Sequence, residues 1–195
     1  AHLAVLASVG CVDVPVMRRP TVAILSTGPE LVPPAQKPGR AQIRNSNASL
    51  LGALLAGAAV LERQISVPDS LSKLERAIAK VASVDVIVAT GGVSMGDFDF
   101  VPRAFTDAGY TPRFHRVALR PGKPIFFATR GRGASRQAVF GLPGNPISVL
   151  VTAWEFLLPY LRAGAGRVPH EPFAIPAVAA ERIARKPGLT QFVLA

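Results

Sequence analysis

The residues best suited to chemistry lie in the segment 85–100, which has the sequence DVIVATGGVSMGDFDF. It begins as an apolar strand, breaks at the adjacent pair Gly91 and Gly92, and continues with a serine and two carboxylates. Glycines allow a sharp turn whose N–H groups can surround a phosphate or a comparable anion. Ser94 can add a hydroxyl, and Asp97 and Asp99 could bind a divalent ion. The same residues also fit an ordinary strand-to-helix turn with an aspartate cap, so both interpretations stay open.

A second loop has the same arrangement. Residues 138–148 have the sequence AVFGLPGNPIS, in which a short apolar strand is followed by two glycines, two prolines and a helix. Asn145 and Ser148 fall at the start of that helix, where the helix dipole favours an anion. They also fit an ordinary helix cap, and the sequence leaves that alternative open. Two such loops in one α/β domain predict a site that holds an anionic ligand.

Charged residues near the ends of predicted strands are further candidates. Arg120 and Lys123 flank a Pro-Gly turn that could direct both cations at one oxyanion. Glu30 and Asp69 each follow a predicted strand and could act as metal ligands or as acid–base carboxylates, although such residues often only solvate a loop. No base lies near Ser94 in the sequence, so we do not expect a Ser-His-Asp triad.

Composition narrows the class of protein. The chain has 195 residues, 49% of them hydrophobic and 17% charged, which predicts one packed domain or one domain plus a fragment. No apolar run reaches the ~18–20 residues that cross a bilayer, and no signal peptide is recognisable, so we expect a cytoplasmic protein without a membrane partner. The single cysteine, Cys11, cannot form an internal disulfide and fits a reducing compartment.

Positive charge is concentrated in one part of the sequence. The formal net charge is +10, and residues 103–136 hold eight Lys and Arg against a single acid, Asp107. Such an excess attracts anions. Nucleic acid is not the expected partner, because no helix-turn-helix, zinc finger or basic stripe with interleaved aromatic residues is recognisable.

Strand and helix patterns alternate along most of the chain. Apolar, β-rich runs predict strands at 21–26, 61–67, 84–89, 114–119, 125–129 and 138–140. Helical periodicity and capping residues predict helices at about 48–56, 70–82, 98–108 and 146–162. This order predicts a three-layer α/β/α domain with a mostly parallel sheet, in which ligands bind beyond the carboxyl ends of the strands. Residues 1–19 indicate a linker and 31–40 a proline-rich loop.

Five short motifs occur in order along the chain: ILSTGPEL at 24–31, IRNSN at 43–47, ATGGVSMGDFD at 89–99, VALRPGKP at 117–124 and GLPGNP at 141–146. Their order and spacing resemble those of the molybdopterin molybdenumtransferases of the MoeA type, which are similar to the gephyrin E domain. The resemblance covers essentially the whole chain. It implies that residues 20–165 form a MogA-like molybdopterin-binding α/β domain. Residues 1–19 would then be the tail of a preceding domain, and 168–195 the incomplete start of a C-terminal β-barrel domain.

The resemblance also implies a reaction and a set of site residues. The family inserts molybdate into adenylylated molybdopterin with a divalent metal such as Mg²⁺, releasing AMP and molybdenum cofactor. Catalytic positions would be Glu30, Asp69 and Asp99, with Asp69 and Asp99 as metal ligands. Arg120, Lys123, Pro124 and Ser148 match a proposed molybdate pocket. The pterin, phosphate and nucleotide would be held by Thr27, Gly28, Ser46, Asn47, Gly91, Gly92, Val93, Ser94, Gly96, Asp97, Pro143, Gly144 and Asn145.

Some positions depart from the family pattern. Pro29 stands where the family usually has Asp, Leu189 where it usually has Arg, and Gln191 where it usually has Glu. The domains that normally precede this segment complete the active site of a homodimer, so this chain alone is expected to carry only part of that site. A non-catalytic, gephyrin-like scaffold for partner proteins of the cofactor pathway and a MogA-like molybdopterin adenylyltransferase remain alternative functions.

Overall fold

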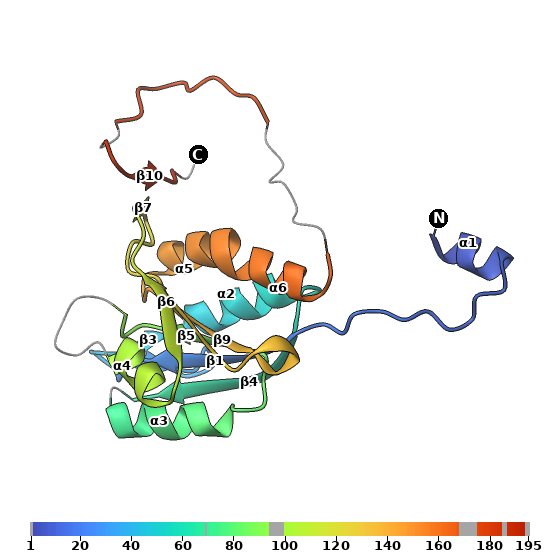
Figure 1. Ribbon diagram of the computed structural model, residues 1–195. Coiled ribbons are helices and arrows are strands. Elements are labelled where there is room, and N and C mark those ends of the chain that lie inside the picture. The colour runs from blue at the N-terminus through green and yellow to red at the C-terminus, as the bar shows by residue number, and fades with distance from the viewer. Residues whose placement is uncertain (1, 69, 94–99, 168–174, 185–186, 194–195) are drawn as a thin grey trace.

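The computed structural model describes residues 2–68, 70–93, 100–167, 175–184 and 187–193. Its centre is a six-stranded sheet with the strand order β4-β1-β5-β9-β8-β6 (Figure 1). The strands β4, β1, β5 and β9 are mutually parallel, whereas β8 runs antiparallel to both of its neighbours. In the order of the sheet the strands are Val60–Val67, Thr21–Thr27, Val86–Thr90, Gln137–Leu142, Phe126–Arg130 and Thr111–His115.

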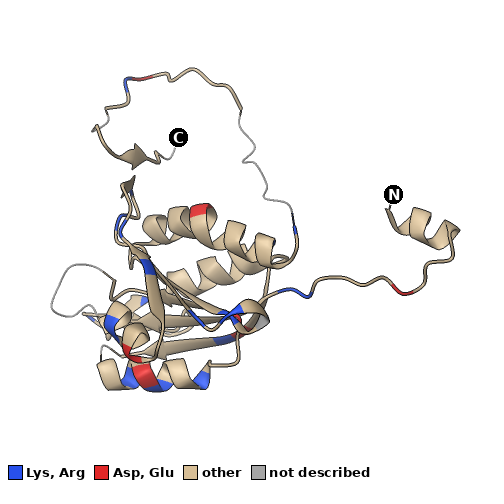
Figure 2. Cartoon of the chain, in the orientation of Figure 1, with Lys and Arg blue, Asp and Glu red and all other residues tan. Residues whose placement is uncertain are grey.

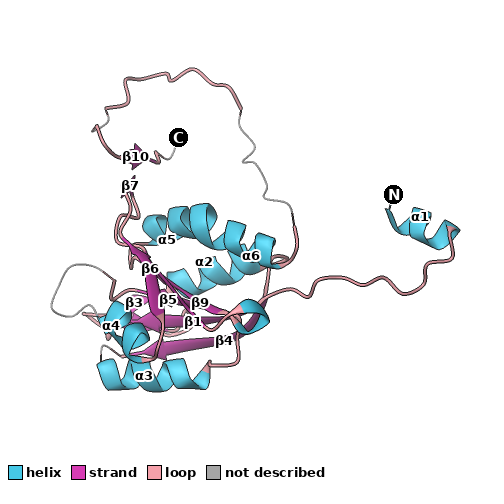
Figure 3. Ribbon diagram, in the orientation of Figure 1, coloured by secondary structure: helices cyan, strands magenta, loops and turns pink. Residues whose placement is uncertain are grey.

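Helices cover both faces of the sheet, as Figure 3 shows. On one face lie α2 (Ser46–Leu55), α5 (Pro146–Thr152) and α6 (Leu158–Gly164), with α5 and α6 joined by a π-helical segment, Ala153–Leu157. On the other face lie α3 (Leu71–Lys80) and α4 (Phe100–Asp107).

The two faces of the sheet have separate hydrophobic cores. Successive side chains of a strand point to opposite faces, so Ile24 packs into the core beneath α2 and α5, whereas Leu25 packs into the core beneath α3 and α4. Both side chains are fully buried. The central residues of β1 and β5 are therefore apolar on both faces, as expected for a parallel sheet covered on both sides.

The prediction of a three-layer α/β domain with a mostly parallel sheet is confirmed, but two local predictions were wrong. The strand predicted at 114–119 is β6, which ends at His115, because Arg116 takes a left-handed backbone conformation with φ of 70° and turns the chain out of the sheet. The proline-rich loop predicted at 31–40 begins with β2 (Leu31–Val32), which pairs in parallel with β3 (Ile43–Arg44).

The segments outside the central sheet are short. The N-terminal segment contains α1 (His2–Ser8), which buries none of its residues. A further two-stranded sheet joins β7 (Leu119–Arg120) to β10 (Thr190–Gln191), near the C-terminus (Figure 1). Residues 175–184 contain no helix or strand, so the β-barrel stays a prediction. Within the described ranges, no helix is long and apolar enough to cross a membrane.

Gln137, at the start of β9, is a buried polar anchor between the sheet and α3. Its amide nitrogen donates hydrogen bonds to the carbonyls of Val81 (3.3 Å) and Val84 (2.5 Å), which follow α3. Its amide oxygen accepts from the Tyr110 hydroxyl and from Arg130 (2.9 Å). This one side chain therefore joins three segments, and it bonds the buried Tyr110 hydroxyl and the Val84 carbonyl at the same time.

Replacing Gln137 by Ala is expected to lower the free energy of unfolding by about 2–4 kcal/mol, because the buried Tyr110 hydroxyl and the Val84 carbonyl lose their hydrogen bonds together. Urea denaturation measures the change. Gln36→Ala, in an exposed loop, is the control and should change stability by less than about 0.5 kcal/mol. Equal effects of the two substitutions would contradict the anchoring role.

Asp85 ties the N-terminal segment to the beginning of β5. Its carboxylate accepts two hydrogen bonds from the Arg18 guanidinium, at 2.5 and 2.7 Å, and further bonds from the Thr21 amide (2.7 Å) and hydroxyl (3.0 Å). The hydrogen bond from Arg18 lowers the pKa of Asp85 below its usual value of 3.8, with help from the Thr21 bonds and against the effect of partial burial.

This lowered pKa predicts an acid-dependent loss of stability. The stabilisation that ionised Asp85 gives the folded state is complete above the unfolded-state pKa of about 3.8. It is lost as the pH falls through the lower pKa of Asp85 in the folded state. Asp85→Asn should therefore make the unfolding free energy less dependent on pH between about pH 5 and pH 2. Asp107→Asn, at an exposed ion pair with Arg103, is the control in the same urea titrations. Parallel pH profiles for wild type and Asp85→Asn would rule the linkage out.

Candidate functional site

A cleft lies at the carboxyl edge of the parallel strands. The strands β1, β5 and β9 are in register there, since Leu25 pairs with Ala89 and Ala89 with Gly141, so the loops that follow them emerge side by side. The start of α2 adds the remaining side of the cleft, which has a volume of about 90 Å³. Its lining residues are Thr27, Glu30, Leu31, Ile43, Arg44, Asn45, Ser46, Asn47, Thr90, Gly91, Gly144 and Pro146.

Gly91 brings the first two loops into close contact. Its φ is +85°, and a Cβ atom at this position would lie 2.7 Å from the Thr27 carbonyl oxygen and 2.8 Å from the Thr27 hydroxyl. The Gly91 amide donates to the Leu142 carbonyl (3.1 Å), and the Thr27 hydroxyl donates to the Thr90 carbonyl (3.1 Å). Only glycine meets both the left-handed conformation and the lack of space, so the ends of the three strands can lie directly against one another here.

Asn47 connects the start of α2 to the third loop. Its side chain is only 8% exposed, and its amide nitrogen donates to the Gly144 carbonyl at 2.8 Å. Its amide oxygen is buried and has no hydrogen-bond partner among the described residues. An unsatisfied buried polar atom costs about 1–3 kcal/mol. A hydrogen-bond donor on a ligand in this cleft would remove that cost.

The loop before α5 ends in a helix cap. The Asn145 side-chain oxygen accepts hydrogen bonds from the amides of Ile147 (3.0 Å) and Ser148 (3.3 Å), and Pro146 occupies the first turn. The capping alternative that the sequence left open is therefore what the structure shows. Because these two amides already have an acceptor, an anion bound here would rely on other donors.

The Arg120–Lys123 turn lies against the side of α5. Gly122 has a φ of +112°, and a Cβ atom there would be 2.5 Å from the Thr152 methyl group and 3.9 Å from the Ser148 carbonyl oxygen. Arg120 and Lys123 are exposed, and neither has a carboxylate within 4.0 Å in the described part of the chain. Two uncompensated cations thus lie beside the helix whose first turn also borders the cleft.

The strand β10 approaches the same turn from the C-terminal segment. Gln191 is the register partner of Arg120, and the Phe192 amide donates to the Arg120 carbonyl at 2.8 Å. Leu189 and Gln191, two of the departures from the family pattern, therefore lie in or next to a strand paired with the cationic turn. Basic residues also occur on the linker, α3, α4 and β6 (Figure 2), so the positive charge is not confined to this turn.

The structure brings the predicted site residues into two neighbouring groups. Thr27, Glu30, Ser46, Asn47, Gly91 and Gly144 line the cleft, and Gly92 lines a smaller hollow beside it with Pro68 and Ser70. The Val93 side chain is 1% exposed and lies in the core, so only its backbone could face a ligand. The second group comprises Arg120, Lys123, Pro124 and Ser148. The predicted residues Asp69, Ser94, Gly96, Asp97 and Asp99 lie outside the described residues.

Sequence reasoning missed several residues of the cleft. Thr90 and Asn45 are buried at its edge, with Asn45 capping α2 through a bond from the Ala48 amide at 3.1 Å. Ile43 and Arg44 line the cleft because β3 pairs with β2. No local sequence pattern predicts this pairing. Among the residues whose placement is described, no group of three or more His, Cys, Asp and Glu gathers that could hold a metal ion.

Comparison with protein families gives a match over most of the chain. Residues 23–163 match the family described as "Probable molybdopterin binding domain". The chain belongs to this family. The matched region runs from β1 to α6 and contains both groups of predicted site residues.

Similar proteins from other organisms support the assignment to this family. The chain is 41% identical over 169 residues to a molybdopterin molybdenumtransferase of Nostoc sp., covering 85% of this chain and 38% of that protein. It is 38% identical over 194 residues to a molybdopterin molybdenumtransferase of Synechococcus elongatus, covering 97% of this chain and 47% of that protein. The chain thus spans less than half the length of these relatives.

Solved structures show the same fold. The molybdopterin biosynthesis MoeA protein of Pyrococcus horikoshii matches with a TM-score of 0.70 and 31% identity, over 84% of this chain and 40% of that one. The tungsten cofactor synthesizing protein MoaB of Pyrococcus furiosus matches with a TM-score of 0.54 and 13% identity, over 76% of this chain and 98% of that one. At that identity the second match shows the fold alone.

Gly91→Ala is expected to lower the free energy of unfolding by at least about 2 kcal/mol, because the new methyl group collides with Thr27 backbone in addition to the cost of a left-handed alanine. Gly57→Ala is the matched control. Gly57 has a φ of +80° but nothing within 4 Å of the added Cβ, so only the conformational cost of about 1–2 kcal/mol applies. Thermal and urea unfolding compare the two variants, and an equal loss in both would refute the close-approach argument.

Proposed function

We propose that this chain acts in molybdenum cofactor biosynthesis, where it binds adenylylated molybdopterin and contributes to the insertion of molybdate with release of AMP. One observation supports the proposal most strongly. Four predicted site residues line the same cleft in a member of the molybdopterin-binding family, namely Thr27, Asn47, Gly91 and Gly144. The relatives are named molybdopterin molybdenumtransferases, so molybdenum transfer is the reaction to test.

The cleft would bind the pterin–nucleotide substrate. The Asn47 amide oxygen is the acceptor that lacks a donor, and pterin and adenine both carry N–H groups that could supply one. Backbone around Gly91 and Gly144 is free of side chains and would accept close approach by phosphate. Glu30, which also lines the cleft, would act as the carboxylate that positions the substrate or moves a proton.

Molybdate would bind at the second group of residues. It is a tetrahedral dianion, and Arg120 and Lys123 provide two positive charges that lack a nearby carboxylate among the described residues. The buried Ser148 lies beside the same turn and would add a hydroxyl donor. Because α5 borders both groups, molybdate would reach the substrate along the first turn of that helix.

A divalent ion such as Mg²⁺ fits the oxygen-rich chemistry of the cleft, where Thr27 and Glu30 offer hydroxyl and carboxylate groups. Asp69 and Asp99 remain the proposed ligands. When bound, the metal would neutralise phosphate oxygens of the substrate.

The proposal leaves part of the active site to other chain segments. We propose a cytoplasmic homodimer in which regions beyond this segment complete the site. Partner proteins of the cofactor pathway would bind to this dimer. Pro29 is exposed in the turn between β1 and β2, next to Glu30, so the missing carboxylate at that position would weaken contacts at the cleft's edge.

Asn47→Ala is expected to weaken binding of adenylylated molybdopterin about tenfold, which corresponds to ~1.4 kcal/mol. Stability should change by less than about 1 kcal/mol, because the substitution removes one hydrogen bond but also one unsatisfied carbonyl. Isothermal titration calorimetry with Mg²⁺ present measures binding, and urea denaturation measures stability. Ser49→Ala, exposed on the same helix, is the control.

The outcomes separate the proposed functions. Failure of the folded wild-type chain to bind the adenylylated pterin, or equal binding by Asn47→Ala, would remove the cleft from the mechanism. Binding followed by molybdate-dependent AMP release supports molybdenum insertion. Binding of the pterin with no AMP release, even in the full-length protein, would instead favour the scaffold function.

A further inference from the structure

A second pocket lies at the opposite edge of the sheet from the cleft. It is bordered by residues at the amino ends of the strands, with Pro20 before β1, Asp85 before β5 and Arg136 before β9, and by Tyr160 and Ala163 on α6. Its volume is about 410 Å³, within the range of about 300–1,000 Å³ typical of small-molecule sites. None of the residues predicted from the motifs lies there.

The N-terminal segment forms a fixed side of this pocket. Arg18 is held by its paired hydrogen bonds to Asp85. A Cβ atom on Gly164 would lie 3.6 Å from the Pro20 ring, and one on Gly166 would lie 2.9 Å from the Met17 side chain. The segment therefore packs directly against the end of α6 and forms one side of a pocket that is open to solvent.

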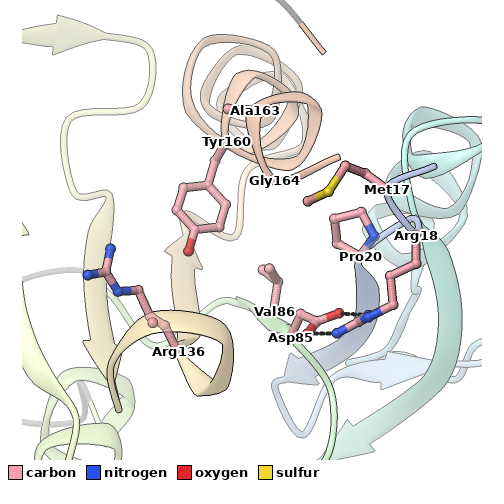
Figure 4. Close-up of a pocket in the computed structure, with 10 residues that line it drawn as sticks. Met17, Arg18, Pro20, Asp85, Val86, Arg136, Tyr160, Ala163 and Gly164 are labelled. Carbon is pink, nitrogen blue, oxygen red and sulfur yellow. Dashed lines mark hydrogen bonds and ion pairs between the residues drawn. The ribbon is translucent and has the colours of Figure 1, made fainter. Parts of the chain in front are cut away.

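The polar groups of the pocket leave one positive charge uncompensated. Asp85 neutralises Arg18 and already accepts bonds from Thr21 as well. The Arg136 guanidinium and the Tyr160 hydroxyl, by contrast, have no hydrogen-bond or ion-pair partner among the described residues. In Figure 4 the Tyr160 ring reaches from α6 into the pocket with its hydroxyl at the tip, and Arg136 lies across the pocket from the Arg18–Asp85 pair.

The rest of the pocket lining is apolar, and neighbouring rings fix the position of the Tyr160 ring. Val86 is 1% exposed, and Met17, Pro20 and Ala163 add aliphatic surface. The Tyr160 ring is held by Phe140 and Phe127, whose ring centroids lie 5.3 and 5.7 Å away. A ligand here would meet an apolar surface with two hydrogen-bond donors, Arg136 and Tyr160, at one side.

We propose that this pocket binds a small organic monoanion, a carboxylate with an aromatic or short aliphatic body. The carboxylate would accept from Arg136 and the Tyr160 hydroxyl, while the body lies on Met17, Pro20 and Val86. A single uncompensated cation matches one negative charge, and it would be too few for a diphosphate or a nucleotide. The proposal is independent of the substrate cleft at the other edge of the sheet.

The test uses 4-phenylbutyrate as the probe and 4-phenyl-1-butanol as its neutral counterpart. Titration of the ¹⁵N-labelled chain is expected to give saturable amide shifts at Val86, Ala163 and Gly164 with a Kd of about 1 mM for the acid. The alcohol should bind at least about fivefold more weakly, because it cannot accept a charge-assisted hydrogen bond.

Matched variants assign the effect to the pocket. Arg136→Gln should weaken binding of the acid about tenfold and leave the alcohol unchanged, and Tyr160→Phe should weaken the acid several-fold while keeping the ring. Arg132→Gln makes the same charge change on the same hairpin outside the pocket, and it should have no effect. Absence of saturable shifts, shifts confined to other residues, or equal effects of the Arg132 and Arg136 variants would each overturn the proposal.

Discussion

The close approach of Gly91 to Thr27 is the constraint on which the candidate site depends. Parallel pairing brings the ends of β1, β5 and β9 together, but side chains at that edge would normally hold the loops apart. A residue without a Cβ atom lets the Gly91 backbone lie directly against Thr27 and bond to Leu142. Asn47 then reaches Gly144 across the cleft. The cleft is thus a product of backbone packing rather than of long side chains.

Features that depend on local sequence patterns could be predicted, whereas features that depend on contacts between distant residues could not. Buried strands such as β1 and β5 have continuous apolar stretches, and the glycine loops that follow them are recognisable, so the layers and the carboxyl edge could be predicted. The end of β6 could not, because it depends on a left-handed arginine that has no local signature. The pairing of β2 with β3, and hence the place of Arg44 at the cleft, depends on contacts between separated residues.

The pocket at the amino edge of the sheet could not be predicted from the sequence, because its lining also depends on contacts between separated segments. Its lining comes from four segments that are far apart in the chain, and each contributes two or three ordinary residues. Arg136 alone indicates a solvated hairpin, and Tyr160 alone indicates a core aromatic. Their chemistry becomes apparent only when the fold places them on one cavity with the Arg18–Asp85 pair between β1 and β5. Both edges of the sheet therefore collect polar groups, through different loops.

The pairing of β10 with β7 keeps the proposed molybdate site apart from the hydrophobic cores. Arg120 lies on a turn outside the central sheet, and its strand neighbour Gln191 belongs to a segment whose described residues contribute nothing to either hydrophobic core. Substitutions at positions 189 and 191 can therefore alter the charge and hydrogen bonding around Arg120 while the α/β layers stay intact. If molybdate binds as proposed, sequence changes in this strand pair would alter anion preference with little effect on folding.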